Sequence, residues 1–67
     1  MLTLKDKDII NTLKQLTTNV IKAMERGDYI NAVIHSDNLE RYALKIRNYN
    51  ASINRAISEA KNKAEGL

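Results

Sequence analysis

The sequence predicts an all-α protein of one small domain, built as an αα-hairpin with a short first helix and a long second helix. Three observations predict this fold class. Apolar residues recur at the 3.6-residue period of an amphipathic helix, proline is absent, and Gly27 is the one glycine away from the chain end. A chain with so few backbone breakers lacks the frequent turns of an all-β fold, so helices packed on helices are expected.

The first helix is expected over residues 4–26. Thr3 and Asp6 have the spacing of a capping box, in which a hydroxyl and a carboxylate satisfy free amides at the start of a helix. The apolar positions that follow include Ile9, Leu13, Leu16, Val20 and Met24. Their spacing of three or four residues places them on one face, which predicts a helix that packs along one side.

Residues 27–28 are expected to form a tight turn. Gly27 suits the left-handed position that follows a helix, and Asp28 is a good N-cap for the next helix. Helices joined by so few residues generally lie antiparallel, so the turn predicts a helical hairpin.

The second helix is expected over residues 29–64. Its apolar positions repeat every seven residues for four heptads, which is typical of a coiled-coil seam. One series contains Ala32, Leu39, Ile46, Ile53 and Ala60, and the other contains His35, Tyr42, Tyr49 and Ala56. A break in this helix would give a three-helix bundle instead. It could lie near 36–38, where a new capping box could start, or near 48–52, where poor helix formers gather.

The two expected helices differ in length, at about 35 Å and about 54 Å for a rise of 1.5 Å per residue. The end of the second helix would therefore present an apolar stripe to water in a monomer. The chain has no cysteine, so disulfides and thiolate metal sites cannot support its small core, and a homo-oligomer formed through the second helix is expected. The expected oligomer seam contains Leu39, Tyr42, Ile46, Tyr49, Ile53, Ala56, Ile57 and Ala60.

No residue pattern indicates an enzyme, a metal site or a cofactor. His35 is the only histidine, and its neighbours Ser36 and Asp37 would point in directions about 100° apart on a helix, so the three cannot form a triad. The sequence contains no glycine-rich phosphate loop and no nucleophile elbow. We therefore expect a non-catalytic protein.

Two hypotheses for function follow from the second helix. The first is an adaptor or inhibitor that binds another protein through helix faces around Leu44 and at the end of the second helix that extends past the first. The apolar surface of the chain exceeds what one hairpin can bury. The alternative is a phosphate-bearing ligand, either a nucleic acid or a small nucleotide, because residues 38–67 hold six basic and three acidic side chains. The basic strip for this alternative contains Arg41, Lys45, Asn48, Ser52 and Arg55, with Tyr42 and Tyr49 beside it for stacking.

The beginning of the chain carries charged residues at positions 5–8 before any apolar run, which is unlike a signal peptide or a transmembrane segment. A cytoplasmic protein without a membrane partner is expected. The richness in Asn, Ile and Lys corresponds to AT-rich codons, and this composition is associated with small proteins of phages and mobile elements.

Overall fold

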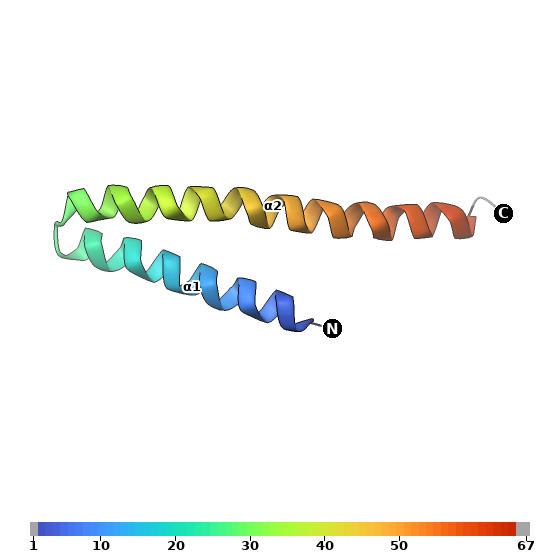
Figure 1. The fold of residues 1–67 in the computed structure, drawn as a ribbon, viewed down its shortest axis with the longest axis horizontal. Helices are drawn as coiled ribbons and strands as arrows, with labels where there is room; N and C mark the ends of the chain where they lie inside the picture. Colours follow the sequence, from blue (N-terminus) through green and yellow to red (C-terminus); the bar gives the residue numbers. More distant parts are fainter. Residues whose placement is uncertain (1, 66–67) are drawn as a thin grey trace.

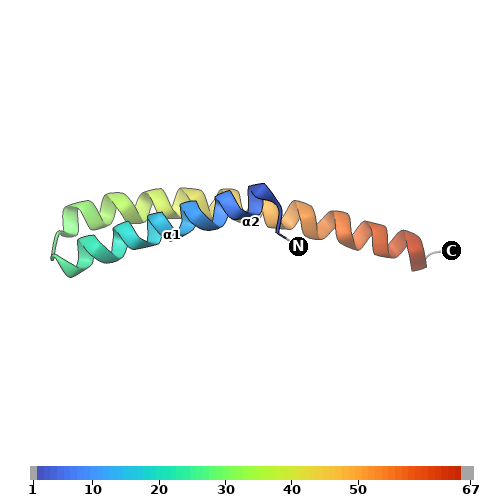
Figure 2. The ribbon, with the colours of Figure 1, turned by 90° about the horizontal axis from the view of Figure 1, so that it is seen from below.

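The structure, a computed structural model, describes residues 2–65. It contains two α-helices, α1 (Leu4–Glu25) and α2 (Tyr29–Glu65), and no strand within that range, so the all-α prediction is confirmed. The helices lie side by side in opposite directions and cross at a shallow angle (Figures 1 and 2). The molecule is a rod of 59 × 19 × 13 Å, because α2 continues well past the start of α1.

The capping box predicted at the start of α1 is present. The Thr3 hydroxyl accepts a hydrogen bond from the Asp6 amide at 3.0 Å, and the Asp6 carboxylate accepts one from the Thr3 amide at 2.9 Å. The two residues thus satisfy each other's backbone donors, which fixes the first turn of α1.

The turn is a Schellman motif. Gly27 has a φ of +69°, the left-handed conformation that glycine adopts without steric cost, as its place in the sequence predicts. Its amide donates to the Met24 carbonyl at 3.0 Å, and the Asp28 amide donates to the Ala23 carbonyl at 2.9 Å. These bonds satisfy the last carbonyls of α1 and reverse the chain direction within three residues. Arg26 is the C-cap, and α1 ends at Glu25.

Asp28 begins α2 as an N-cap. Its carboxylate accepts hydrogen bonds from the Asn31 amide at 3.2 Å and from the Asn31 side chain at 2.6 Å. The helix then runs to Glu65 without interruption, through both of the segments 36–38 and 48–52. The Asp37 carboxylate pairs with Arg41 one turn later, at 3.1 Å, instead of capping a new helix. The described residues therefore form two helices and not a three-helix bundle.

The contact between the helices is narrow. Ala23 is 0% exposed and Ala32 is 8% exposed, and these two small residues lie in the helices on either side of the turn. Further from the turn the contact is made by half-buried side chains, which are Ile9, Leu13, Leu16 and Val20 of α1 and His35, Leu39, Tyr42, Ile46 and Tyr49 of α2. None of the large side chains among the described residues is fully buried. Neither helix, over these residues, has the length and apolar character needed to cross a bilayer.

Candidate functional site

Tyr49 joins the middle of α2 to the start of α1. Its hydroxyl donates a hydrogen bond of 2.7 Å to Asp6, a residue 43 positions earlier in the chain. The Lys5 ammonium lies 4.8 Å from the centroid of the Tyr49 ring, within the range of a cation–π interaction. Because the other carboxylate oxygen of Asp6 caps α1, a single side chain connects the first turn of α1 to α2.

Hydrogen bonds determine the ionisation of the residues at both helix starts. The backbone amide of Thr3 lowers the pKa of Asp6, and the Tyr49 hydroxyl lowers it further. The same contact with Asp6 raises the pKa of the Tyr49 phenol. At the start of α2, the side chain of Asn31 and then its backbone amide lower the pKa of Asp28. Each helix start is therefore stabilised by an ionised aspartate.

Acid is expected to loosen both helix starts. Because the folded-state pKa values of Asp6 and Asp28 are lowered, their stabilisation is complete above the unfolded value of about 3.9 and is lost as the pH falls through the lower folded values. Tyr49→Phe removes one donor to Asp6, so it should lower the midpoint of thermal unfolding more at neutral pH than in acid. Circular dichroism measures both midpoints, with Tyr29→Phe, whose ring is exposed, as the control. Equal losses at the two pH values would contradict the assigned role of Asp6.

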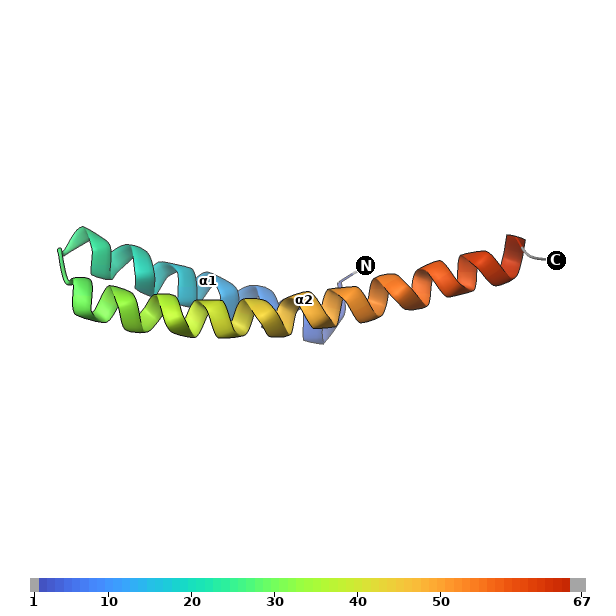
Figure 3. The ribbon, with the colours of Figure 1, turned by 90° about the horizontal axis from the view of Figure 1, so that it is seen from above.

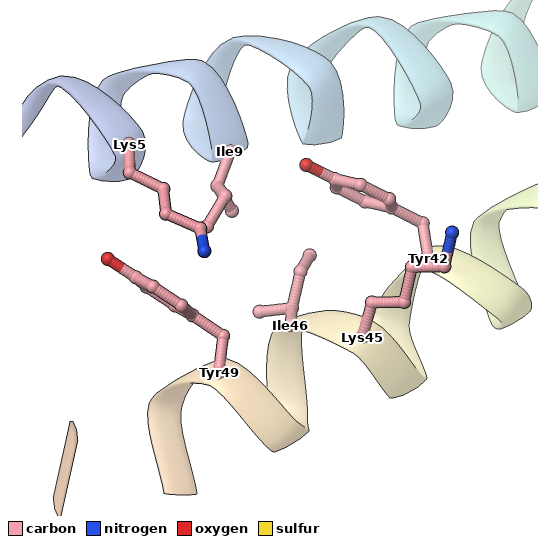
Figure 4. A pocket seen from close by; sticks show the side chains of 6 residues that line it. All are labelled: Lys5, Ile9, Tyr42, Lys45, Ile46 and Tyr49. Atoms are coloured by element: carbon pink, nitrogen blue, oxygen red, sulfur yellow. The ribbon is translucent and has the colours of Figure 1, made fainter. Parts of the chain in front are cut away.

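A pocket of about 270 Å³ lies between the start of α1 and the middle of α2. Its lining residues are Lys5 and Ile9 of α1 with Tyr42, Lys45, Ile46 and Tyr49 of α2 (Figure 4). The two tyrosine rings project toward α1, with Ile46 between them. The tyrosines proposed for stacking on bases thus lie in the contact between the helices.

The basic strip is exposed along α2, with all five of its side chains open to solvent. Arg41 is paired with Asp37, which reduces its free positive charge. Of the strip, Lys45 lines the pocket that contains both tyrosines. One face of Tyr49 is occupied by Lys5, so the structure does not place an open tyrosine face beside the strip at that position.

The expected oligomer seam divides into two parts. Leu39, Tyr42, Ile46 and Tyr49 are half-buried on the side of α2 that faces α1. Ile53, at 40% exposed, lines a groove of about 410 Å³ with Ile9 and Leu13 of α1. The other three residues, which are Ala56, Ile57 and Ala60, are exposed. We call the part of α2 after Ile53 the overhang, and Figure 3 shows the end of α2 extending alone past α1. The heptad pattern could not reveal this division, because the phase is the same in both parts.

A further apolar surface lies near the turn. A groove of about 430 Å³ is lined by Met24 of α1 and by Tyr29, Ala32, Val33, Ser36, Asp37 and Glu40 of α2. Tyr29 is 72% exposed and Val33 is 68% exposed. Leu44, which is 58% exposed, continues this line one turn beyond Glu40. We call Met24, Tyr29, Val33, Leu44 and the acidic pair Asp37 and Glu40 the turn-end surface.

Sequence reasoning identified Leu44 on this surface and missed Tyr29 and Val33, because they lie outside the heptad positions. Their spacing of four residues on α2 was the available signal. His35, the only histidine, is half-buried on the side facing α1, and no group of three potential metal ligands occurs among residues 2–65. Comparison with protein-family models, with curated proteins and with solved structures finds no match to this chain.

Proposed function

We propose that this chain is a non-catalytic helical protein that binds another protein through the turn-end surface, as an adaptor or inhibitor, and associates with itself through α2. One observation carries the proposal: among the described residues the buried hydrophobic side chains are the two alanines, Ala23 and Ala32. A core this small gives a marginally stable fold. A partner that covers apolar helix surface would stabilise the folded state as it binds.

The composition of the turn-end surface indicates the chemistry of that partner. Its centre is formed by exposed apolar and aromatic side chains, the residue types that anchor protein interfaces. Glu40 lies at its edge, next to Asp37, which pairs with Arg41. A helix that presents apolar side chains flanked by lysine or arginine would complement both features.

Binding of a phosphate-bearing ligand to the basic strip has less support. Arg41 already pairs with a carboxylate, and both tyrosines project toward α1. The strip has five exposed side chains and no enclosing walls from α1 except beside Lys45. Apolar surface, by contrast, is exposed at both ends of the hairpin, so protein binding is the function we favour.

Val33→Asp is expected to abolish binding of the partner. The substitution places a carboxylate in the centre of the turn-end surface, where burial against a partner would desolvate it. Tagged wild-type protein and the variant would be used to capture proteins from a lysate of the source cell, followed by titration of the captured protein. We expect the dissociation constant to rise at least about tenfold, as for loss of an interface anchor.

Asn62→Asp is the matched control, because it makes the same charge change at an exposed position far along α2. Circular dichroism should show equal helix content for both variants. Equal capture of the same partner by wild type and Val33→Asp would remove the turn-end surface as the binding site.

A further inference from the structure

We infer that the pocket between the start of α1 and the middle of α2 binds a small planar aromatic carboxylate. The ring of this ligand lies against Tyr42 and the two isoleucines of the pocket, and its carboxylate meets the Lys5 ammonium. The inference goes beyond protein binding, because it assigns a small-molecule ligand to a separate part of the hairpin. Val33, at the centre of the turn-end surface, does not line this pocket.

The pocket has the size of a small ligand site and is shared by both helices. Its volume of about 270 Å³ lies just below the range of about 300–1,000 Å³ that is typical of drug-sized ligands, so a ligand of one or two rings suits it. Residues of α1 and of α2 line it together. A ligand held there contacts both helices, so its binding should raise the midpoint of thermal unfolding.

The body of the pocket is apolar and aromatic. Ile9 of α1 and Ile46 of α2 line it from the two helices, and Tyr42 projects its ring toward α1 (Figure 4). All three side chains are half-buried. Aromatic rings pack well against other rings in offset or edge-to-face contact and against aliphatic side chains. The lining therefore suits the flat apolar body of an aromatic molecule.

The charged groups of the pocket are ammonium groups that lack a carboxylate partner. Lys5 and Lys45 line it, and the Lys5 ammonium lies 4.8 Å from the centroid of the Tyr49 ring. Within residues 2–65 the one ion pair joins Arg41 to Asp37. No aspartate or glutamate of that range lines the pocket, so its charge is complementary to an anion.

The two tyrosine hydroxyls of the pocket differ in their hydrogen bonds. The Tyr49 hydroxyl donates to Asp6 at 2.7 Å. The Tyr42 hydroxyl has no hydrogen-bond partner among residues 2–65, although its ring is half-buried. It is therefore a further donor that an anion in the pocket could use.

A carboxylate suits these donors better than a phosphate group does. Phosphate sites in proteins favour the paired donors of arginine, and no arginine of the described chain lines the pocket. The Asp6 carboxylate, bonded to Tyr49 beside the pocket, opposes a second negative charge on the ligand. A ligand with one negative charge satisfies the lysines without this repulsion.

Titration of the isotope-labelled full chain with naphthoate, followed by the NMR signals of its backbone amides, tests the site. We expect saturable shifts at Ile9, Tyr42 and Ile46 and none at Val33, with a dissociation constant of about 0.1–1 mM. Naphthamide has the same two rings without the charge. It should bind at least about fivefold more weakly, because the ammonium groups favour the carboxylate.

Lys5→Gln removes the charge of the ammonium and keeps a side chain of similar length. It should weaken naphthoate binding at least about fivefold and leave naphthamide binding within about twofold of the wild type. Lys7→Gln is the matched control, because Lys7 is an exposed lysine of α1 that does not line the pocket. Both replaced lysines are exposed, so circular dichroism should show equal helix content for the two variants.

Four results would overturn the inference. One is the absence of saturable shifts with naphthoate up to about 10 mM, and another is a shift at Val33 as large as that at Ile46, which would indicate unspecific adsorption. The third is equal loss of affinity in Lys5→Gln and Lys7→Gln, which would remove Lys5 as the partner of the carboxylate. The fourth is tighter binding of adenosine monophosphate than of naphthoate, which would assign a phosphate-bearing ligand instead.

Discussion

Ala23→Leu is expected to push the two helices apart and to lower the midpoint of thermal unfolding strongly. Ala23 has no exposed surface and lies close to the turn, where α1 cannot move away from α2 without breaking the Schellman motif. Adding bulk to a packed contact costs about 1–3 kcal/mol. A single small core supplies about 3–5 kcal/mol in total, so this loss removes a large part of the stability.

Thermal unfolding followed by circular dichroism measures the effect. Ala43→Leu is the control, because it adds the same side chain at an exposed position of α2. If Ala23→Leu melts at the same temperature as Ala43→Leu, the helices are not in close contact at Ala23.

Leu39→Asp is expected to have the second large effect, which is loss of helix content. Leu39 is half-buried on the side of α2 that faces α1, in the middle of the contact. The substitution removes the packing of a leucine, worth about 2–5 kcal/mol when fully buried and less here, and places an ionised carboxylate between the helices. Together these terms are comparable with the whole stability of the fold.

Leu44→Asp is the control for Leu39→Asp, because Leu44 is exposed on the turn-end surface and its replacement should preserve helix content. The pair also tests which contact the covered part of the seam makes. A Leu39→Asp protein that kept its helix content and changed only its oligomeric mass would show that Leu39 contacts a second copy and not α1.

Features that depend on neighbouring residues could be predicted from the sequence. The capping box of Thr3 and Asp6, the left-handed Gly27 and the N-cap Asp28 each depend on residues within a few positions, and each is present in the structure. The length of α2 could also be predicted, because the heptad phase continues through the segments of poor helix formers.

Features that depend on the pairing of the two helices could not be predicted. The bond between Tyr49 and Asp6 joins residues 43 positions apart, and no local pattern specifies that partner. The heptad pattern places Tyr49 in an oligomer seam and beside the basic strip, because an amphipathic face does not show which helix will cover it. Tyr29 and Val33 of the turn-end surface belong to neither heptad series, so the heptad pattern does not indicate that they form a binding surface.

The distribution of contacts along the hairpin gives its folding a direction. Ala23 and Ala32 are nine residues apart in the chain, whereas Asp6 and Tyr49 are separated by 43, and the entropy lost on closing a loop grows with its length. Contacts between the two helices should therefore form first at the turn and then progressively away from it. The bond between Tyr49 and Asp6 should form last and break first. Opening of that end would uncover Ile9 and Ile46. A hairpin that is transiently open would then expose a longer apolar face of α2, and two such chains could exchange their first helices.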